Sequence, residues 1–487
     1  MKRKSMGLNA ALNGIRSVLN ILFPIITFPY VSRILQVKGI GIYNFSNSVV
    51  SYFLLIAALG VSNYAVREGA RIRDNKKEIS QFSSEVFTIN IFSTLFSYIL
   101  LFICLFAFTR LHNYIPCIAI FSLQIFFTTI GTEWIYQIYE DYTYITVRSI
   151  LFQLISLVLL FVFVRHANDY LNYAAITVFS SVGANFLNFI HARKYCHIQL
   201  KWNFNWRVKL KPILILFGVN IASMIYVNSD ITLLGLMKND YIVGIYSVSS
   251  KVYQIVKTLI AAILVVTVPR LAMLFGKKRI KEYKEILSRL TNILVLLALP
   301  ASVGLFMLAK EVILIISGDK FLPASNSLRI LCFAYIFSIL GWILTECVLI
   351  PAKREKFVLR STTISAILNI VLNLLLIPSL NENAAAISTI LAECCIFIVN
   401  YHYAKDLVKD VFLSRKLLKT FITSIIGCLG IIIICIICNI IFSSIIMKTI
   451  FSICFSVILY FLILALFRNE FVIEIIKSFR EKIKINK

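Results

Sequence analysis

One lysine stands deep inside a long apolar stretch of this sequence, where its charge could hold an anion. Lys257 lies near the middle of the apolar run 241–272, too far from either end for its ammonium to reach polar surroundings easily. Tyr246 and Gln254 precede it on the same side of a helix, and we predict that they contact a substrate together with Lys257. Lys257 is therefore either paired with an acid such as Asp230 or part of a cavity that binds an anion.

A second cation, Arg16, belongs to a polar stripe on the first apolar run. The other members of the stripe are Asn9, Asn13, Asn20 and Thr27. All five share one helical face within roughly 60°. Such a stripe usually faces a bundle interior or a wet cavity. We therefore predict that Arg16, Asn13 and Asn20 contact a substrate; the alternative is that Arg16 extends to the inner surface.

Acidic residues also interrupt the apolar runs. Asp230 shares roughly 80° of a helical face with Asn220 and Ser223. Glu133, Glu346 and Glu393 are among the glutamates of the other runs. A carboxyl group among apolar atoms favours its protonated form and can exchange a proton. We predict that the four acids couple transport to H⁺ or Na⁺ and that Asn220 contacts the substrate; interhelical hydrogen bonds or ion pairs are the alternative.

The remaining motifs do not favour an enzyme. The sequence contains no phosphate-binding P-loop, no cluster with metal-ligand spacing and no nucleophile next to a base. Its eleven cysteines lie mostly in apolar runs, where they are interpreted as small apolar residues. We therefore expect no cofactor, no metal and no catalytic residue.

The elements that position these charges are predicted to be membrane-spanning helices. Hydrophobic residues make up 59% of the 487 residues, and the mean hydropathy is +0.86. The apolar runs are continuous rather than alternating, which favours helices over barrel strands. We predict fourteen spans: 8–32, 40–64, 79–108, 114–138, 143–164, 170–190, 212–237, 241–272, 287–316, 323–350, 357–378, 383–403, 418–441 and 445–467.

The distribution of basic residues predicts the orientation. With the N-terminus inside, the inner segments hold 35 of the 49 lysines and arginines, and the outer ends and loops hold eight. Both termini are therefore expected in the cytoplasm, with an uncleaved first helix. The net charge of +26 is explained by this topology, and no single basic domain indicates nucleic-acid binding.

A repeated phrase predicts two related halves. "GIYNFSNSV" begins at Gly41 and "GIYSVSSKV" at Gly244, 203 residues later. Six predicted spans separate the two copies, so both halves run in the same direction. The expected organisation is a six-helix lobe (1–190), a basic cytoplasmic linker (191–211), a second six-helix lobe (212–405), an appended helix pair with its connecting segment (406–467) and a basic cytoplasmic tail (468–487). The second copy leads to Lys257, whereas the first leads to Leu54.

Three phrases resemble a known family: "LFPIITFPYVSRILQVKGIGIYNFSNSVVSYF", "GTEWIYQIYEDYTYIT" and "NSDITLLGLMKNDYIVGIYSVSSKV". The chain resembles the multidrug/oligosaccharidyl-lipid/polysaccharide (MOP) exporters, and within them the Wzx-type flippases. The resemblance implies an all-α integral membrane protein of the MATE/MOP type, with two lobes in a V-shape. It implies a multi-pass protein of the bacterial inner membrane that moves a polyprenyl-pyrophosphate-linked oligosaccharide to the outer leaflet. A polysaccharide polymerase and a chain-length regulator are further expected partners.

Two other functions remain open. A MATE-like multidrug exporter of the same superfamily would take cationic substrates, which the acids favour and the two cations disfavour. A membrane scaffold for polysaccharide assembly would leave the intramembrane charges without a use. An integral-membrane glycosyltransferase would need a large outer loop with catalytic acids, and the predicted outer loops are short.

Overall fold

The computed structural model describes residues 6–473, without the side chains of 6–22, 215–216, 219 and 265–266. Within this part, the chain forms helices and no strand. Eleven of its helices are long and apolar enough to cross a membrane, and twelve if the bent pair Ala324–Cys332 and Ala334–Leu349 counts as one span. The all-α membrane fold is confirmed, and the count of fourteen spans stays a prediction.

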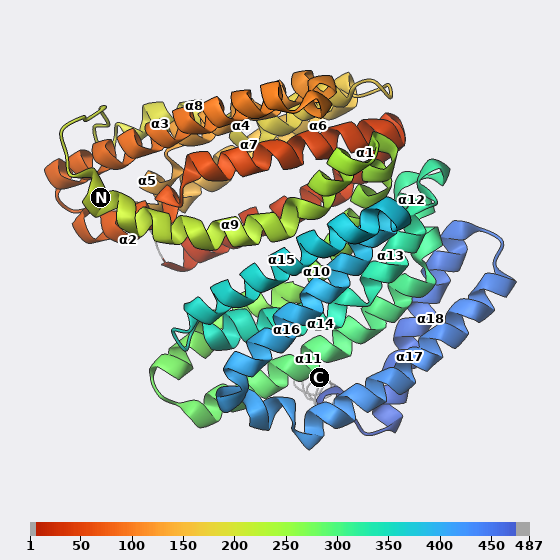
Figure 1. Cartoon of the computed structure of the whole chain (residues 1–487). Coiled ribbons are helices and arrows are strands. Elements are labelled where there is room, and N and C mark those ends of the chain that lie inside the picture. Colours follow the sequence, from red (N-terminus) through yellow and green to blue (C-terminus); the bar gives the residue numbers. More distant parts are fainter. Residues whose placement is uncertain (1–5, 474–487) are drawn as a thin grey trace, which may run out of the picture. The chain divides into compact units, whose positions relative to one another are not determined.

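The contacts between residues divide the chain into two compact units, Met1–Gly244 and Ile245–Lys487. The expected lobe boundaries at the linker 191–211 stay predictions. The first unit holds α1 (Met6–Ala58), α2 (Val61–Ile72), α3 (Lys76–Ala107), η1 (Thr109–Tyr114), α4 (Ile115–Gly131), α5 (Glu133–Ile138), α6 (Tyr142–Phe163), α7 (Tyr170–Val182), α8 (Asn185–Ala192) and α9 (Trp206–Met237) (Figure 1).

The segment labelled α1 covers the first expected span and most of the second. The backbone at Gln36 has a φ of 59°, outside the helical region, so α1 consists of two helices that meet at a kink there. At the far end of α1, Leu59 and Gly60 also have positive φ. The boundary between the first two expected spans therefore lies at the kink, with no separate loop between them.

Polar side chains of α3 complete the hydrogen bonding at the end of α1. Asn90 and Ser93 donate to the carbonyl oxygen of Ala57 at 2.8 and 2.6 Å, and Ser97 donates to that of Phe53 at 2.5 Å. The last carbonyls of a helix have no partner within the helix, and lipid offers none. These buried polar residues therefore serve structure and do not line a cavity.

The two repeated glycines lie at a close contact between α1 and the start of α10 (Asp240–Gly276). A Cβ on Gly41 would lie 1.9 Å from the carbonyl oxygen of Asp240, and one on Gly244 would lie 2.0 Å from that of Val37. Val37 and Asp240 are also 203 residues apart. Each glycine thus meets the counterpart of the other's neighbour in the repeated phrase.

The segment that follows α8 runs along α3. The backbone N–H groups of residues 197, 199 and 201 donate to the hydroxyls of Ser80, Ser84 and Thr88 at 3.1, 3.1 and 3.0 Å. Two extended residues advance about 6.7 Å and one helical turn about 5.4 Å, so alternate amides stay near successive hydroxyls. We call residues 197–201 the strap.

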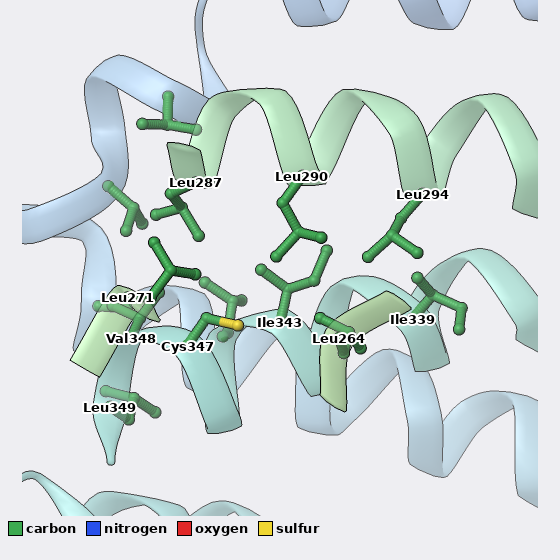
Figure 2. Packing of buried hydrophobic residues seen from close by; sticks show 14 of the residues in the cluster. Leu264, Leu271, Leu287, Leu290, Leu294, Ile339, Ile343, Cys347, Val348 and Leu349 are labelled. Atoms are coloured by element: carbon green, nitrogen blue, oxygen red, sulfur yellow. The ribbon is translucent and has the colours of Figure 1, made fainter. Parts of the chain in front are cut away.

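The second unit holds the rest of α10, α11 (Ile280–Met307), α12 (Ala309–Ser317), η2 (Asp319–Phe321), α13 (Ala324–Cys332), α14 (Ala334–Trp342), the π-helix η3 (Ile343–Leu349), α15 (Glu355–Leu380), α16 (Glu382–Phe412), α17 (Arg415–Ile441) and α18 (Ile445–Leu466). Figure 2 shows part of its core. Leucines of α11 face apolar residues of α14 and η3: Leu287, Leu290, Leu294, Ile339, Ile343 and Cys347.

The last two helices form an antiparallel pair that packs on α11 (Figure 1). Tyr460 of α18 is buried and donates a hydrogen bond to the carbonyl oxygen of Leu296 at 2.9 Å. Gly427 of α17 lies against its ring. The other faces of α17 and α18 expose a run of isoleucines and leucines, as expected for helices that face lipid.

Candidate functional site

The charged centre of the second unit is an ion pair between Lys257 of α10 and Glu393 of α16. The ammonium Nζ lies 2.8 Å from Oε1 of the carboxylate. The hydroxyl of Ser338, on α14, donates to the same oxygen at 2.9 Å. The Glu393 side chain is 6% exposed and the Lys257 side chain 24% exposed. The carboxylate is thus enclosed, whereas part of the lysine remains accessible.

Both members of the pair lie far from the ends of their helices. Lys257 is about 26 Å from the Asp240 end of α10, and Glu393 is about 17 Å from the Glu382 end of α16, at 1.5 Å per residue. A membrane's apolar core is about 30 Å thick. We therefore expect both charges within the apolar core of the membrane, where an unpaired charge is costly.

Aromatic rings border the lysine. Its Nζ lies 5.8 Å from the centre of the Tyr253 ring and 6.0 Å from that of Trp342. These distances are at the outer limit of cation–π attraction. Trp342 ends α14, directly before the π-helix η3. A π-helical turn often marks a functional site, because its extra residue breaks the regular hydrogen-bond ladder.

Two other described lysine–glutamate pairs are similarly shielded, but they lie closer to helix ends. Lys209 binds Glu85 at 2.7 Å, and Lys448 of α18 binds Glu311 of α12. Each of these four residues lies within about three turns of a helix end. They join neighbouring helices and are not expected to meet a substrate, so they provide a comparison for the central pair.

Three predicted substrate residues lie outside the described side chains. Arg16, Asn13 and Asn20 belong to residues 6–22 of α1, for which only the helix is described. Their role in substrate binding stays a prediction.

The other predicted substrate residues differ in exposure. Tyr246 is buried, and its hydroxyl lies 3.3 Å from that of Thr389 on α16. Its contact with a substrate stays a prediction. Gln254 is exposed, one turn from Lys257 on α10, and Asn220 on α9 is half-buried. Gln254 is therefore the candidate polar contact nearest to Lys257 along the helix.

The predicted acids do not form one cluster. The structure gives Lys257 a different acid from the one suggested by sequence, Glu393 instead of Asp230. Asp230 is buried on α9 of the first unit. Glu133 is half-buried and begins α5, and Glu346 is half-buried in η3 beside Trp342.

Ser338 and Trp342 could not be predicted as site residues from the sequence. They lie one helical turn apart on α14, so they share a face. That spacing is the only signal the sequence offers, and a serine and a tryptophan in an apolar run do not by themselves indicate a site. Ser338 matters because it fixes the carboxylate of Glu393, and Trp342 because it borders the ammonium.

The arrangement can bind an anion or exchange a proton. A lysine ammonium has three N–H donors. Glu393 Oε1 accepts one of them, and the exposed part of Lys257 can present others to an anionic group. The three helices α10, α14 and α16 hold these groups in the bundle interior without any metal ligand cluster among the described residues.

Comparisons with known proteins agree with this description. The model of the polysaccharide biosynthesis protein family matches residues 7–275, and the MatE family model matches residues 215–375. A probable low-salt glycan biosynthesis flippase of Haloferax volcanii is 25% identical over 40% of this chain and 41% of its own length. A protein of Shigella dysenteriae described as a putative O-antigen transporter is 23% identical over 72% of this chain and 88% of its own.

The fold is shared with a solved transporter. A lipid II flippase MurJ in an inward closed conformation aligns with a TM-score of 0.75 at 15% identity, covering 96% of this chain and 99% of that one. At this identity the likeness shows the fold alone. The family model covers more than half of the chain and confirms the resemblance found in the sequence. The chain is a multi-pass membrane protein that belongs to the polysaccharide biosynthesis protein family of the MOP exporter superfamily.

Proposed function

We propose that this protein is a flippase for polyprenyl-pyrophosphate-linked oligosaccharides. It moves them from the cytoplasmic to the outer leaflet of the bacterial inner membrane by alternating access, driven by an H⁺ or Na⁺ gradient, for surface polysaccharide synthesis. Both of its termini lie in the cytoplasm. One of the two relatives is named a glycan biosynthesis flippase and the other an O-antigen transporter, and both names support this substrate class.

One observation carries the proposal: a partly accessible ammonium in the core of the membrane, at Lys257. A pyrophosphate carries at least two negative charges, and its transfer through a low-dielectric region needs a compensating cation. Lys257 is placed to supply that charge, and Arg16 is the expected second cation. Gln254 and Asn220 are candidate partners for sugar hydroxyls.

The test is a gene deletion that is rescued by variants. We expect the deletion strain to lose surface polysaccharide and to accumulate lipid-linked oligosaccharide in the cytoplasmic leaflet. Wild type and the control Glu311→Gln should restore export, whereas Lys257→Ala and Arg16→Ala should not. Leaflet location is measured by accessibility of the glycan to an added lectin or periodate. Export by Lys257→Ala at the wild-type level would contradict the proposed cation site.

A multidrug exporter is the second candidate, because the MatE model matches residues 215–375. Cationic substrates would favour Asp230 and the membrane glutamates as binding groups. The same deletion strain distinguishes the two: unchanged surface polysaccharide with lower resistance to cationic dyes would support the exporter. Unchanged polysaccharide and unchanged resistance would support neither transporter.

A further inference from the structure

The acid beside Lys257 has a consequence for how an anion reaches that lysine. Glu393 forms a direct ion pair with the ammonium of Lys257, and Ser338 donates a hydrogen bond to the same carboxylate. A diphosphate that binds Lys257 brings at least two negative charges next to the Glu393 carboxylate. Like charges at close range in an apolar region repel strongly.

We propose that Glu393 is the resident counter-ion of Lys257 and that it takes up a proton when a diphosphate binds there. The proposal rests on the proposed function and assigns Glu393 a role as a positioning residue. Without ligand, the pair is neutral, so neither charge is left unpaired in an apolar region. With ligand, one proton from solvent on a Glu393 oxygen removes the repulsion and leaves Lys257 to the diphosphate.

The surroundings of Glu393 fit this exchange. The groups that face its carboxyl are Lys257 and Tyr253 from α10 and Ser338 from α14. On α15, the Ser365 hydroxyl donates its hydrogen bond to the carbonyl oxygen of Ala392 instead of to the Glu393 carboxylate. None of these neighbours is a second cation that could hold the carboxylate in its charged form once Lys257 turns to a ligand.

Tyr253 offers a replacement hydrogen bond. Its hydroxyl is buried, and Ser338 and Glu393 are the polar side chains that act on it. When the ammonium moves to a ligand, this hydroxyl can bond to the Glu393 carboxyl and satisfy both groups.

The proposal predicts a linkage between proton and anion. A ligand that raises the proton affinity of Glu393 is itself bound more tightly when Glu393 is protonated, because coupling between two binding events is reciprocal. Glu393→Gln keeps the shape of the side chain and removes its charge. It therefore mimics the protonated state permanently.

The experiment measures diphosphate binding and proton uptake together. The full-length protein in lipid nanodiscs is titrated with farnesyl diphosphate near pH 7, by calorimetry in two buffers of different ionisation enthalpy. We expect wild type to take up close to one proton more per bound ligand than Glu393→Gln. Subtracting the proton uptake of Glu393→Gln from that of wild type cancels the protons that the ligand itself gains or loses on binding. We also expect Glu393→Gln to bind about tenfold more tightly, a change of about 1.4 kcal/mol.

Controls separate this exchange from general damage. Glu311→Gln neutralises a comparably shielded glutamate near a helix end and should bind and take up protons like wild type. Lys257→Gln should bind at least tenfold more weakly than wild type. Thermal unfolding of each variant in nanodiscs checks that it is folded.

The outcomes distinguish the two proposals. If wild type binds through Lys257, but Glu393→Gln matches wild type in affinity and proton uptake, the counter-ion role is wrong and the flippase proposal stands. Weaker binding by Glu393→Gln likewise contradicts exchange and shows that the carboxylate only orients the lysine. If wild type, Glu393→Gln and Lys257→Gln all fail to bind the probe, both proposals are refuted.

Discussion

The reciprocal glycine contact leads to a prediction about stability. Alanine at Gly41 would put a Cβ 1.9 Å from the carbonyl oxygen of Asp240, and alanine at Gly244 would put one 2.0 Å from that of Val37. Ordinary contact begins near 3.4 Å, so the two backbones must separate by about 1.5 Å, the difference between these distances. Both obstacles are main-chain atoms, which cannot turn away. Overpacking of this kind costs about 1–3 kcal/mol.

The two substitutions should also depend on each other. Val37 and Gly41 are one turn apart on α1, and Asp240 and Gly244 are one turn apart on α10. A separation that accommodates the first alanine also makes room for the second. The double variant Gly41→Ala/Gly244→Ala should therefore lose less than the sum of the two single losses, as expected for coupled neighbours.

Gly304→Ala is the matched control. Gly304 lies within α11, and a Cβ there would meet nothing within 4 Å. Glycine in a helix interior is less stable than alanine by about 0.5–1 kcal/mol, so this variant should gain stability. The assay is unfolding of the purified protein by graded denaturant, followed by tryptophan fluorescence. If Gly41→Ala and Gly244→Ala are as stable as Gly304→Ala, the close contact does not exist in solution. Full additivity in the double variant would refute the reciprocal geometry.

Two further predictions concern polar groups outside the apolar core. Ser84→Ala removes the acceptor of the Gln199 amide and should cost about 0.5–1.5 kcal/mol; faster hydrogen exchange at residues 197–201 would show it, and unchanged exchange would contradict it. The backbone N–H groups of Arg165 and His166 bind the Asp169 carboxylate at 2.9 and 2.8 Å and lower its pKa. A carboxyl group whose pKa is lowered by folding stabilises the folded state at pH values above its unfolded-state pKa of about 3.9. This stabilisation is lost as the pH falls through the pKa of the folded state. Asp169→Asn should therefore flatten the fall of stability below about pH 4; an unchanged acid transition would argue against this linkage.

The helices could be predicted from the sequence because lipid leaves the backbone little choice. Each expected span lies mostly in helical backbone, since a continuous apolar run can satisfy its backbone only within itself, but several spans are divided over two or three helices. The breaks were harder to predict. The first two expected spans meet at a kink at Gln36 instead of at a loop, and the π-helix η3 lies inside an expected regular span. Neither residue type nor period signals a break of this kind.

The candidate site was only partly predictable. The depth of Lys257 in its apolar run showed that it needs a partner or a ligand. Its partner could not be identified, because helical periodicity places residues on faces and does not say which faces meet. Asp230 and Glu393 were equally suitable by type and depth. The contact with Glu393 follows from the packing of α10, α14 and α16, which no local pattern encodes.

The strap also limits the distance over which parts of the first unit can move. Its last hydrogen bond fixes the amide of Lys201 to Thr88, and α9 begins at Trp206. The five chain steps between Lys201 and Trp206 reach about 18 Å at most when fully extended. While the strap holds, the Trp206 end of α9 can therefore move away from α3 by no more than that reach. Any larger movement requires the strap to detach first. The three hydrogen bonds between the strap and α3 must then break, and their loss can be measured as a free-energy cost of that movement.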